Sequence, residues 1–214
     1  MKSLLTLISF TCFLVLGYAQ NTLEINNDFE ENLTDYKKRN PIYDYSENQL
    51  NNTDTIPGFE TKANKLKITG TIYESDGVTP AKDVILYIYQ SDENGDYEIK
   101  NVNDRRYVYH RGWIKTNTEG QYTFYTFIPG SAITPLTFPR RRGPKQILPT
   151  IKEPNKSEYN LSAFLFEDDP LLTKSCRKRL KRKGIDSILK LKKEDGMYVA
   201  IKNIVLNKSA EVYK

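Results

Sequence analysis

The chain has 214 residues, of which 38% are hydrophobic and 12% aromatic, enough to form one well-cored domain with a tail. Lysine and arginine outnumber aspartate and glutamate by 32 to 27, which gives a net charge of +5. The sequence has no glycine-rich phosphate loop, no cysteine pair spaced for zinc and no G-x-S-x-G elbow, which argues against those classes of enzyme. Its 15 tyrosines and 10 prolines, with few long helical patterns, favour β structure.

Residues 1–19 have the pattern of a signal peptide. Lys2 supplies a positive charge, residues 4–16 form an apolar segment too short to span a membrane comfortably, and small residues precede a cleavage point after Ala19. An uncleaved membrane anchor is the alternative. Cleavage predicts an exported protein that meets the membrane only during export. Cys176 would then be its only cysteine, so no internal disulfide is expected.

Residues 20–64 differ in composition from the rest of the chain. They contain nine acidic residues against four basic ones, and their aromatic residues are scattered without a period. We therefore expect a flexible acidic N-terminal extension, followed by a domain over 65–208 and a tail over 209–214.

Short apolar runs predict six to eight β-strands in the domain. The first covers 66–72, and the second, 84–89, is apolar on both faces and should be central. Further strands are expected at 107–109, 113–116, 122–127, 147–151, 161–166 and 197–206. The Asn-Thr-Glu-Gly sequence before Gln121 predicts a hairpin connection with a left-handed Gly120. Many short strands separated by turns are typical of an all-β sandwich.

One short helix is expected over Leu171 to Lys183, because acidic residues precede it and basic residues fill its last turns. The basic run that begins at Lys174 could bind nucleic acid on charge alone. An exported protein rarely meets nucleic acid, so a solvated helix face is preferred and no nucleic-acid partner is expected.

Three segments carry a resemblance to a known family. They are ILYIYQSDENGDY, which ends at Tyr97, TNTEGQYTFYTFIPG, which ends at Gly130, and FPRRRGPKQIL, which ends at Leu148. Their succession resembles the intradiol ring-cleavage dioxygenases, and most of all the small secreted bacterial members. Those carry a Q-A/S-D-x-x-G-x-Y segment, a T-D-x-x-G-x-Y-x-F-x-T-x-x-P-G segment, then Y-P and H-I-H. The resemblance covers 65–207, includes the D-D-P-L-L-T segment at 168–173, and implies a β-sandwich fold.

In that family two tyrosinates and two histidines hold Fe(III), a hard ion that prefers anionic oxygen, and one position is left for hydroxide and the incoming catecholate. Carried over to this sequence, the first tyrosine falls on Tyr97 and the second on Phe138. The two histidines fall on Gln146 and Leu148. If residues 131–137 are an insertion, the second tyrosine falls on Ala132 instead, and neither register restores a phenol. Only Tyr97 keeps a chemically competent side chain.

The resemblance also places the family's catalytic arginine at or beside Gly143, which makes Arg142 the candidate. Arg140, Arg141 and Lys145 make the same segment strongly basic. They are candidates for binding an anionic ligand such as an aromatic carboxylate, and a solvated basic loop is the alternative.

His110 is the chain's single histidine and lies outside the family's ligand positions. A rescued metal site that combines it with Tyr97 and an acid such as Asp96 is one interpretation. A partly exposed histidine with a structural role is the preferred one, since neutral imidazole finds hydrogen-bond partners easily in loops.

The leading hypothesis is an exported protein with the intradiol-dioxygenase fold that has lost catalysis and serves as a binding or structural module without a cofactor. A small aromatic or anionic ligand and a homodimer are both compatible with it. The first alternative is an active Fe(III) dioxygenase that opens catechol-type rings, with Tyr97 as a ligand. The second is a transthyretin-like binding module, which the segment ITGTIYESDGVTPAKDVILYIYQ alone would suit.

Overall fold

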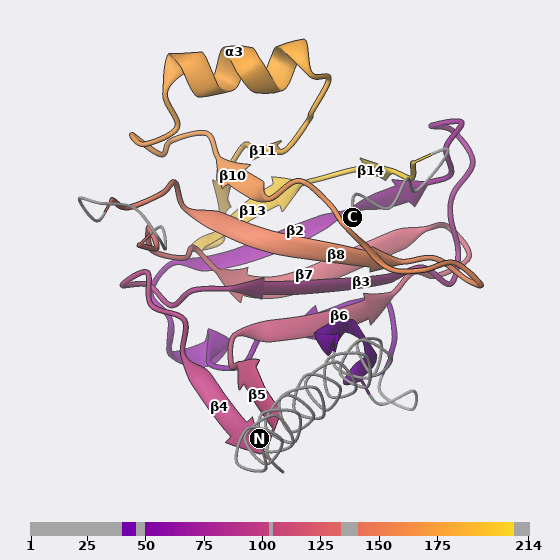
Figure 1. Cartoon of the computed structure of the whole chain (residues 1–214), viewed down its shortest axis with the longest axis horizontal. Helices are drawn as coiled ribbons and strands as arrows, with labels where there is room; N and C mark the ends of the chain where they lie inside the picture. Colours follow the sequence, from indigo (N-terminus) through magenta and orange to yellow (C-terminus); the bar gives the residue numbers. More distant parts are fainter. Residues whose placement is uncertain (1–39, 46–49, 103–104, 134–140, 208–214) are drawn as a thin grey trace, which may run out of the picture. The chain divides into compact units, whose positions relative to one another are not determined.

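The computed structural model describes residues 40–45, 50–102, 105–133 and 141–207, which belong to two units (Figure 1). The predicted signal peptide and the predicted tail lie outside the described residues. The first unit, Met1–Asp44, contains the 3-10 helix η1 (Pro41–Tyr43), and the Ile42 backbone N–H donates to the side chain of Asn40 at its start. The second unit, Tyr45–Lys214, contains the β structure. No helix formed by the described residues is long and apolar enough to cross a membrane.

The first sheet is organised around β2 (Lys65–Tyr73). On one side β2 pairs antiparallel with β7 (Gln121–Phe127), which in turn pairs with β1 (Thr53–Thr55). On the other side it pairs in parallel with β13 (Met197–Ile201) and with the short β14 (Ile204–Val205). β12 (Lys192–Glu194) pairs with β13 at the edge.

The second sheet has β3 (Ile85–Gln90) in its interior, which confirms that the strand expected over 84–89 is central. Antiparallel neighbours flank it, β6 (Arg111–Lys115) on one side and β8 (Gln146–Lys152) on the other. Beyond β8 lie β10 (Phe164–Phe166) and β11 (Ile188–Leu189), and the short β9 (Tyr159–Asn160) also pairs with β8. Separately, β4 (Ile99–Val102) and β5 (Arg105–Val108) form a two-stranded ribbon.

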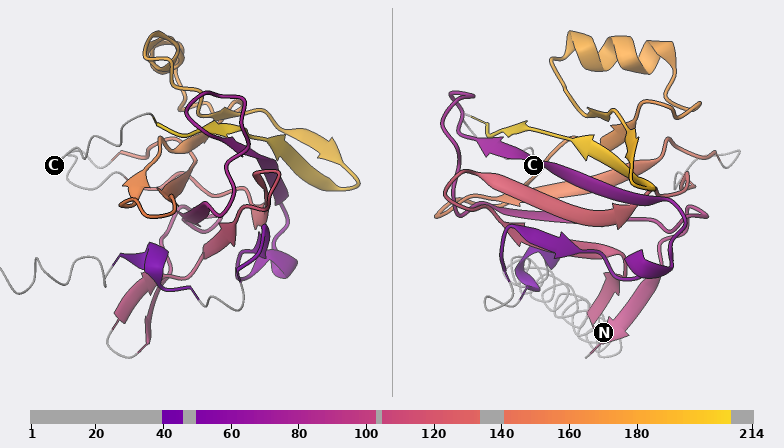
Figure 2. Two further views of the ribbon diagram at one scale, coloured as in Figure 1. Left: turned by 90° about the vertical axis from the view of Figure 1, so that its right-hand side faces the viewer. Right: turned by 180° about the vertical axis from the view of Figure 1, so that it is seen from behind.

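The core lies between the inward faces of these two sheets, as in a β-sandwich (Figure 2). Alternate residues of each strand point inward, so the apolar side chains of the two sheets meet. The fully buried members include Leu66, Ile68, Ile72 and Phe124 from the first sheet and Leu86, Ile88, Ile114, Ile147 and Ile151 from the second.

The expected boundary between extension and domain at residue 65 is wrong. β1 joins the first sheet ahead of it, Ile56 is buried in the core, and the 3-10 helix η3 (Phe59–Thr61) follows. A three-residue polar strand has no apolar alternation, so nothing in the sequence pattern distinguished it from an extension. Of the residues 20–64 expected to be flexible, at least those from β1 onward are integral to the sandwich.

The hairpin expected between 113–116 and 122–127 is also wrong, because the two strands lie in different sheets. β6 pairs with β3, whereas β7 pairs with β2 and β1. The turn itself is as expected, since Gly120 has φ of +66° and donates its backbone N–H to Asn117 O at 3.0 Å. The turn therefore carries the chain across the sandwich, as connections between sheets do in Greek-key folds.

The helix expected over 171–183 is observed as α3 (Lys174–Arg182), which starts later than expected. The Cys176 backbone N–H donates to the Thr173 side chain at 3.2 Å, so Thr173 is the N-cap. Leu172 is buried in the turn before the helix. In both Figure 1 and Figure 2, α3 stands at the outer side of the sandwich, joined to it by loops.

Candidate functional site

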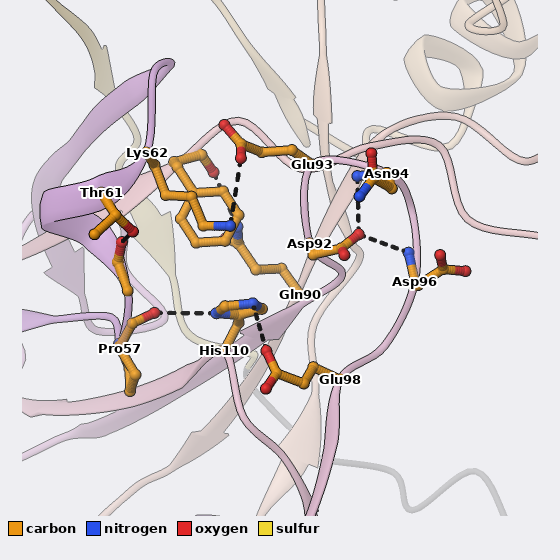
Figure 3. Close-up of polar contacts among 12 residues, drawn as sticks. Pro57, Thr61, Lys62, Gln90, Asp92, Glu93, Asn94, Asp96, Glu98 and His110 are labelled. Carbon is orange, nitrogen blue, oxygen red and sulfur yellow. Dashed lines mark hydrogen bonds and ion pairs between the residues drawn. The ribbon is translucent and has the colours of Figure 1, made fainter.

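A tight turn after β3 determines where Tyr97 lies. The Asp92 carboxylate accepts hydrogen bonds from the backbone N–H groups of Asn94 at 2.8 Å and Asp96 at 2.9 Å, and Asp92 N donates to Asp96 O at 2.8 Å (Figure 3). Partial burial raises the pKa of Asp92, but the hydrogen bonds from Asp96, Asn94 and Gly95 together outweigh it and hold that pKa below its usual range. The ionised carboxylate thus fixes the turn that delivers Tyr97.

Two glycines allow this turn to pack against the segment after β7. Gly95 has φ of +92°, and a Cβ there would lie 2.2 Å from Ser131 O. A Cβ on Gly130 would lie 2.4 Å from Gly95 N. Only residues without a side chain fit these two contacts, which explains both glycines of the resemblance on packing grounds.

A buried glutamine connects the same region to the other sheet. The Gln90 side chain, at the end of β3, donates to Phe127 O at 2.9 Å and accepts from the Thr126 hydroxyl at 2.8 Å. Next to it, the Ser91 hydroxyl donates to Gly130 O at 3.1 Å. Each polar group is satisfied, so this part of the motif serves to hold the two sheets together.

Beside the turn, the outer face of the second sheet carries a row of aromatic rings. Tyr87 and Tyr89 of β3 stack with their ring centroids 5.7 Å apart. Trp113 of β6 lies 5.2 Å from Tyr87, and Tyr97 lies 6.3 Å from Tyr89. The Arg111 guanidinium extends the row, 4.8 Å from the Trp113 ring and 3.9 Å from that of Tyr107. Alternating strand positions therefore build a continuous row of ring contacts, in which Tyr87 is buried.

Three of the four positions that the resemblance assigns to metal ligands lie on this face. Gln146 and Leu148 alternate along β8, Leu148 is opposite Tyr89 in the sheet register, and the Gln146 side chain is hydrogen-bonded to the Tyr97 hydroxyl. Burial raises the pKa of the Tyr97 phenol, and the hydrogen bond to Gln146 lowers it by less. The fourth position, Phe138, lies outside the described residues.

The donors on this face do not fit a ferric ion. Tyr97 offers one phenol, Gln146 offers a neutral amide, and Leu148 offers no lone pair. Within the described ranges no three histidine, cysteine or acidic side chains come together in a way that could hold a metal ion. The face offers rings and polar atoms to a ligand, but of its three assigned positions only Tyr97 carries an oxygen that a metal could ionise, and none carries an imidazole.

Some of the basic residues near this face make contacts that hold the structure together, and others are exposed on the surface. The Arg142 guanidinium donates to Ser131 O at 2.6 Å and to Asn94 O at 2.9 Å, so it fastens the turn. Lys145 gives its backbone N–H to the buried Asp169 carboxylate, which positions the start of β8. Arg141 is exposed, and Arg140 lies outside the described residues. Roles for these residues in catalysis or anion binding stay predictions.

His110 lies on the opposite face of the second sheet from Tyr97. Its ring packs edge-on against Phe127 of the first sheet at 4.9 Å, and Nδ1 lies 3.0 Å from Pro57 O (Figure 3). Nε2 has no hydrogen-bond partner and lies 3.5 Å from the Glu98 carboxylate. At 2% exposure the histidine is buried rather than partly exposed, because the bend before β6 places its ring against Phe127 of the first sheet. It cannot join Tyr97 in a rescued metal site.

Sequence reasoning missed the aromatic row as a unit. The sequence pattern predicts Tyr87, Tyr89 and Trp113 only as strand residues, although Tyr87 and Tyr89 alternate as one face of a strand requires. That alternation was a usable signal, but the pairing of β6 beside β3, which adds Trp113 and Arg111, was not visible in it.

No family model matches the sequence, and no curated protein matches it significantly. Solved structures do match. The chain is 16% identical to the dioxygenase domain of a dioxygenase–carbohydrate-binding protein fusion from Streptomyces sp. SirexAA-E, with a TM-score of 0.54 over 77% of this chain and 94% of that one. For 3-chlorocatechol 1,2-dioxygenase from Rhodococcus opacus 1CP the identity is 20% and the TM-score 0.56, over 75% and 68%.

Catechol 1,2-dioxygenase from Acinetobacter sp. ADP1 gives a TM-score of 0.55 at 15% identity, over 72% of this chain and 56% of that enzyme. The chain thus spans little more than half of that larger relative. At such identities the agreement concerns the path of the backbone. The protein has the β-sandwich fold of the intradiol ring-cleavage dioxygenases.

Proposed function

We propose that the protein is an exported, non-catalytic binding protein on the intradiol-dioxygenase fold, whose Tyr97 face takes a small aromatic or anionic ligand without iron. The observation that carries this proposal is the donor set of the face: a phenol, an amide and an alkyl side chain at three assigned ligand positions. Export rests on the signal-peptide pattern of residues 1–19.

The aromatic row supports the ligand class. Tyr97, Tyr89 and Trp113 are partly exposed and offer rings on which a planar ring can stack, and the buried Tyr87 packs between Tyr89 and Trp113. The Tyr97–Gln146 pair supplies polar atoms at one end, and Arg111 supplies a cation at the other. A ring that carries a hydroxyl or a carboxylate matches this distribution.

An active dioxygenase is the second candidate, favoured by the likeness to solved catechol and chlorocatechol dioxygenases. Iron content separates the two. After expression with added iron, we expect well under one iron per chain and no visible tyrosinate-to-iron absorption band. One iron per chain, with a visible band that disappears in Tyr97→Phe, would establish the dioxygenase instead. Oxygen consumption with catechol, protocatechuate or hydroxyquinol, expected to be absent, is the accompanying assay.

Ligand binding can be followed through Trp113, the chain's single tryptophan. Benzoate and catechol should change its fluorescence saturably, and Gln146→Ala with Tyr97→Phe should raise Kd about ten-fold, the equivalent of about 1.4 kcal/mol. Tyr125→Phe, in β7 of the other sheet, is the matched control and should bind normally. Loss of binding in the control, or an unchanged Kd in the double variant, would place the ligand elsewhere.

A further inference from the structure

The positive charge of the chain is concentrated in α3 and the residue after it. Residues 174–183 hold seven lysines and arginines and no acid, so the rest of a chain whose net charge is +5 would carry −2. The net positive charge of the chain therefore depends on this one segment.

Two of the seven bases, Arg177 and Arg179, make side-chain contacts within the protein, and Arg179 Nη2 lies 3.9 Å from Cys176 Sγ. Arg177 faces the sandwich and donates through Nε to Leu172 O at 3.1 Å and through Nη2 to Glu167 O. The six side chains other than that of Arg177 are exposed, and among the described residues none of them forms an ion pair with an acid. They are Lys174, Lys178, Arg179, Lys181, Arg182 and Lys183.

The outward side of α3 is an uninterrupted row of like charges. Lys174, Lys178 and Arg182 follow each other at i, i+4 and i+8, so they lie on one side of the helix, about 6 Å apart along its axis. The half-buried Cys176, Arg177 and Leu180 lie on the side toward the sandwich. Like charges at this spacing repel one another and destabilise a helix, and a bound row of anions would relieve that repulsion.

We propose that this face of α3 binds a linear polyanion, specifically an acidic polysaccharide with carboxylate or sulfate groups repeated along its chain. Figure 2 shows that α3 stands outside the sandwich. A straight row of cations on such a helix matches a linear ligand. An anionic membrane fits less well, because the large exposed apolar side chains lie outside the helix and it has none to insert into lipid. The predicted export favours a polysaccharide over nucleic acid.

The test is binding to polygalacturonate and to heparin at about 0.15 M salt, where long-range attraction is largely screened. In the variant Lys174→Gln/Lys178→Gln/Arg182→Gln we expect Kd to rise at least about ten-fold and the salt dependence of binding to weaken by roughly one unit of slope per lost contact. The charge-matched control, Lys82→Gln/Arg106→Gln/Lys192→Gln, removes three exposed charges elsewhere and should change Kd by less than about two-fold.

Three outcomes would overturn the proposal. The wild-type protein does not bind either polyanion at that salt, or both triple variants bind equally, or duplex DNA or vesicles with anionic lipid bind more tightly than polygalacturonate. Neutral dextran, which should not bind, excludes recognition of the sugar alone. Thermal unfolding of each variant verifies that the fold persists.

Discussion

At the scale of single residues, the turn before Tyr97 depends on the absence of side chains. Gly95 combines φ of +92° with an approach of 2.2 Å between a built Cβ and Ser131 O. Gly196 has a similar φ of +83° but no atom within 4 Å of a built Cβ. Substituting Gly196 therefore costs only the strained backbone conformation, whereas substituting Gly95 adds the cost of a close contact.

We predict that Gly95→Ala destabilises the protein by about 2–4 kcal/mol, whereas Gly196→Ala costs about 1–2 kcal/mol, the left-handed conformation alone. Denaturant unfolding of the two variants and the wild type measures both values. Equal losses would mean that the segment carrying Ser131 yields to the new methyl group and that the turn is not held as tightly as its contacts indicate.

The residues of the family-like motif can be recognised from the sequence, but their structural roles cannot. In the sequence, Gln90, Asp92 and Gly95 belong to the segment that carries the resemblance to the dioxygenases. Each has a complete structural explanation in the turn or in the bridge between sheets. Packing alone therefore accounts for these motif residues, because loosening the turn would cost stability whether or not a metal binds.

At the scale of elements, β1 closes the edge of the sandwich by contacting both sheets. It pairs with β7, and the carboxylate of its Asp54 accepts the Trp113 backbone N–H of β6 at 2.8 Å. Burial raises the pKa of Asp54, and the hydrogen bonds from Trp113 and Thr55 offset only part of that rise. One partly buried carboxylate thus links an edge strand to the second sheet.

We predict that Asp54→Ala destabilises the protein by about 1–3 kcal/mol, because the Trp113 N–H loses that acceptor, and that Asp54→Asn costs less. The raised pKa also fixes a pH dependence: a carboxyl whose pKa is higher in the folded protein binds its proton more tightly there. The wild type should gain stability relative to Asp54→Asn as the pH falls from neutral to about 4, near the ordinary aspartate pKa. Unfolding curves at several pH values measure this, and a difference that shrinks on acidification would contradict it.

Strand positions were largely predictable, and strand partners were not. Apolar alternation located β2, β7 and β8 to within a residue or two, because each strand buries one face. It could not show that β6 and β7 belong to different sheets, since a turn sequence specifies local conformation and not the neighbour across the sheet. It also missed β1, whose attachment depends on backbone pairing and on Asp54 rather than on apolar side chains.

At the scale of the whole molecule, the fold brings together positions that are distant in sequence. Tyr97 follows β3, whereas Gln146 and Leu148 belong to β8, and antiparallel pairing of the two strands puts all three on one face. The resemblance assigns these three positions to one site, and the structure places them on one face of the sheet. What they bind depends on side-chain chemistry, and that chemistry can be changed without altering the backbone.

This argument predicts a gain of function. Gln146→His with Leu148→His would place two imidazoles beside the Tyr97 phenol, and a ferric ion prefers that set to an amide and an alkyl group. We expect iron content per chain to rise well above the wild-type value and a visible tyrosinate-to-iron band to appear. Adding Tyr97→Phe to the double variant should remove the band while the histidines remain. A band that survives this third substitution would show that another tyrosine holds the metal, and a folded double variant without iron would show that the face no longer has the geometry of a metal site.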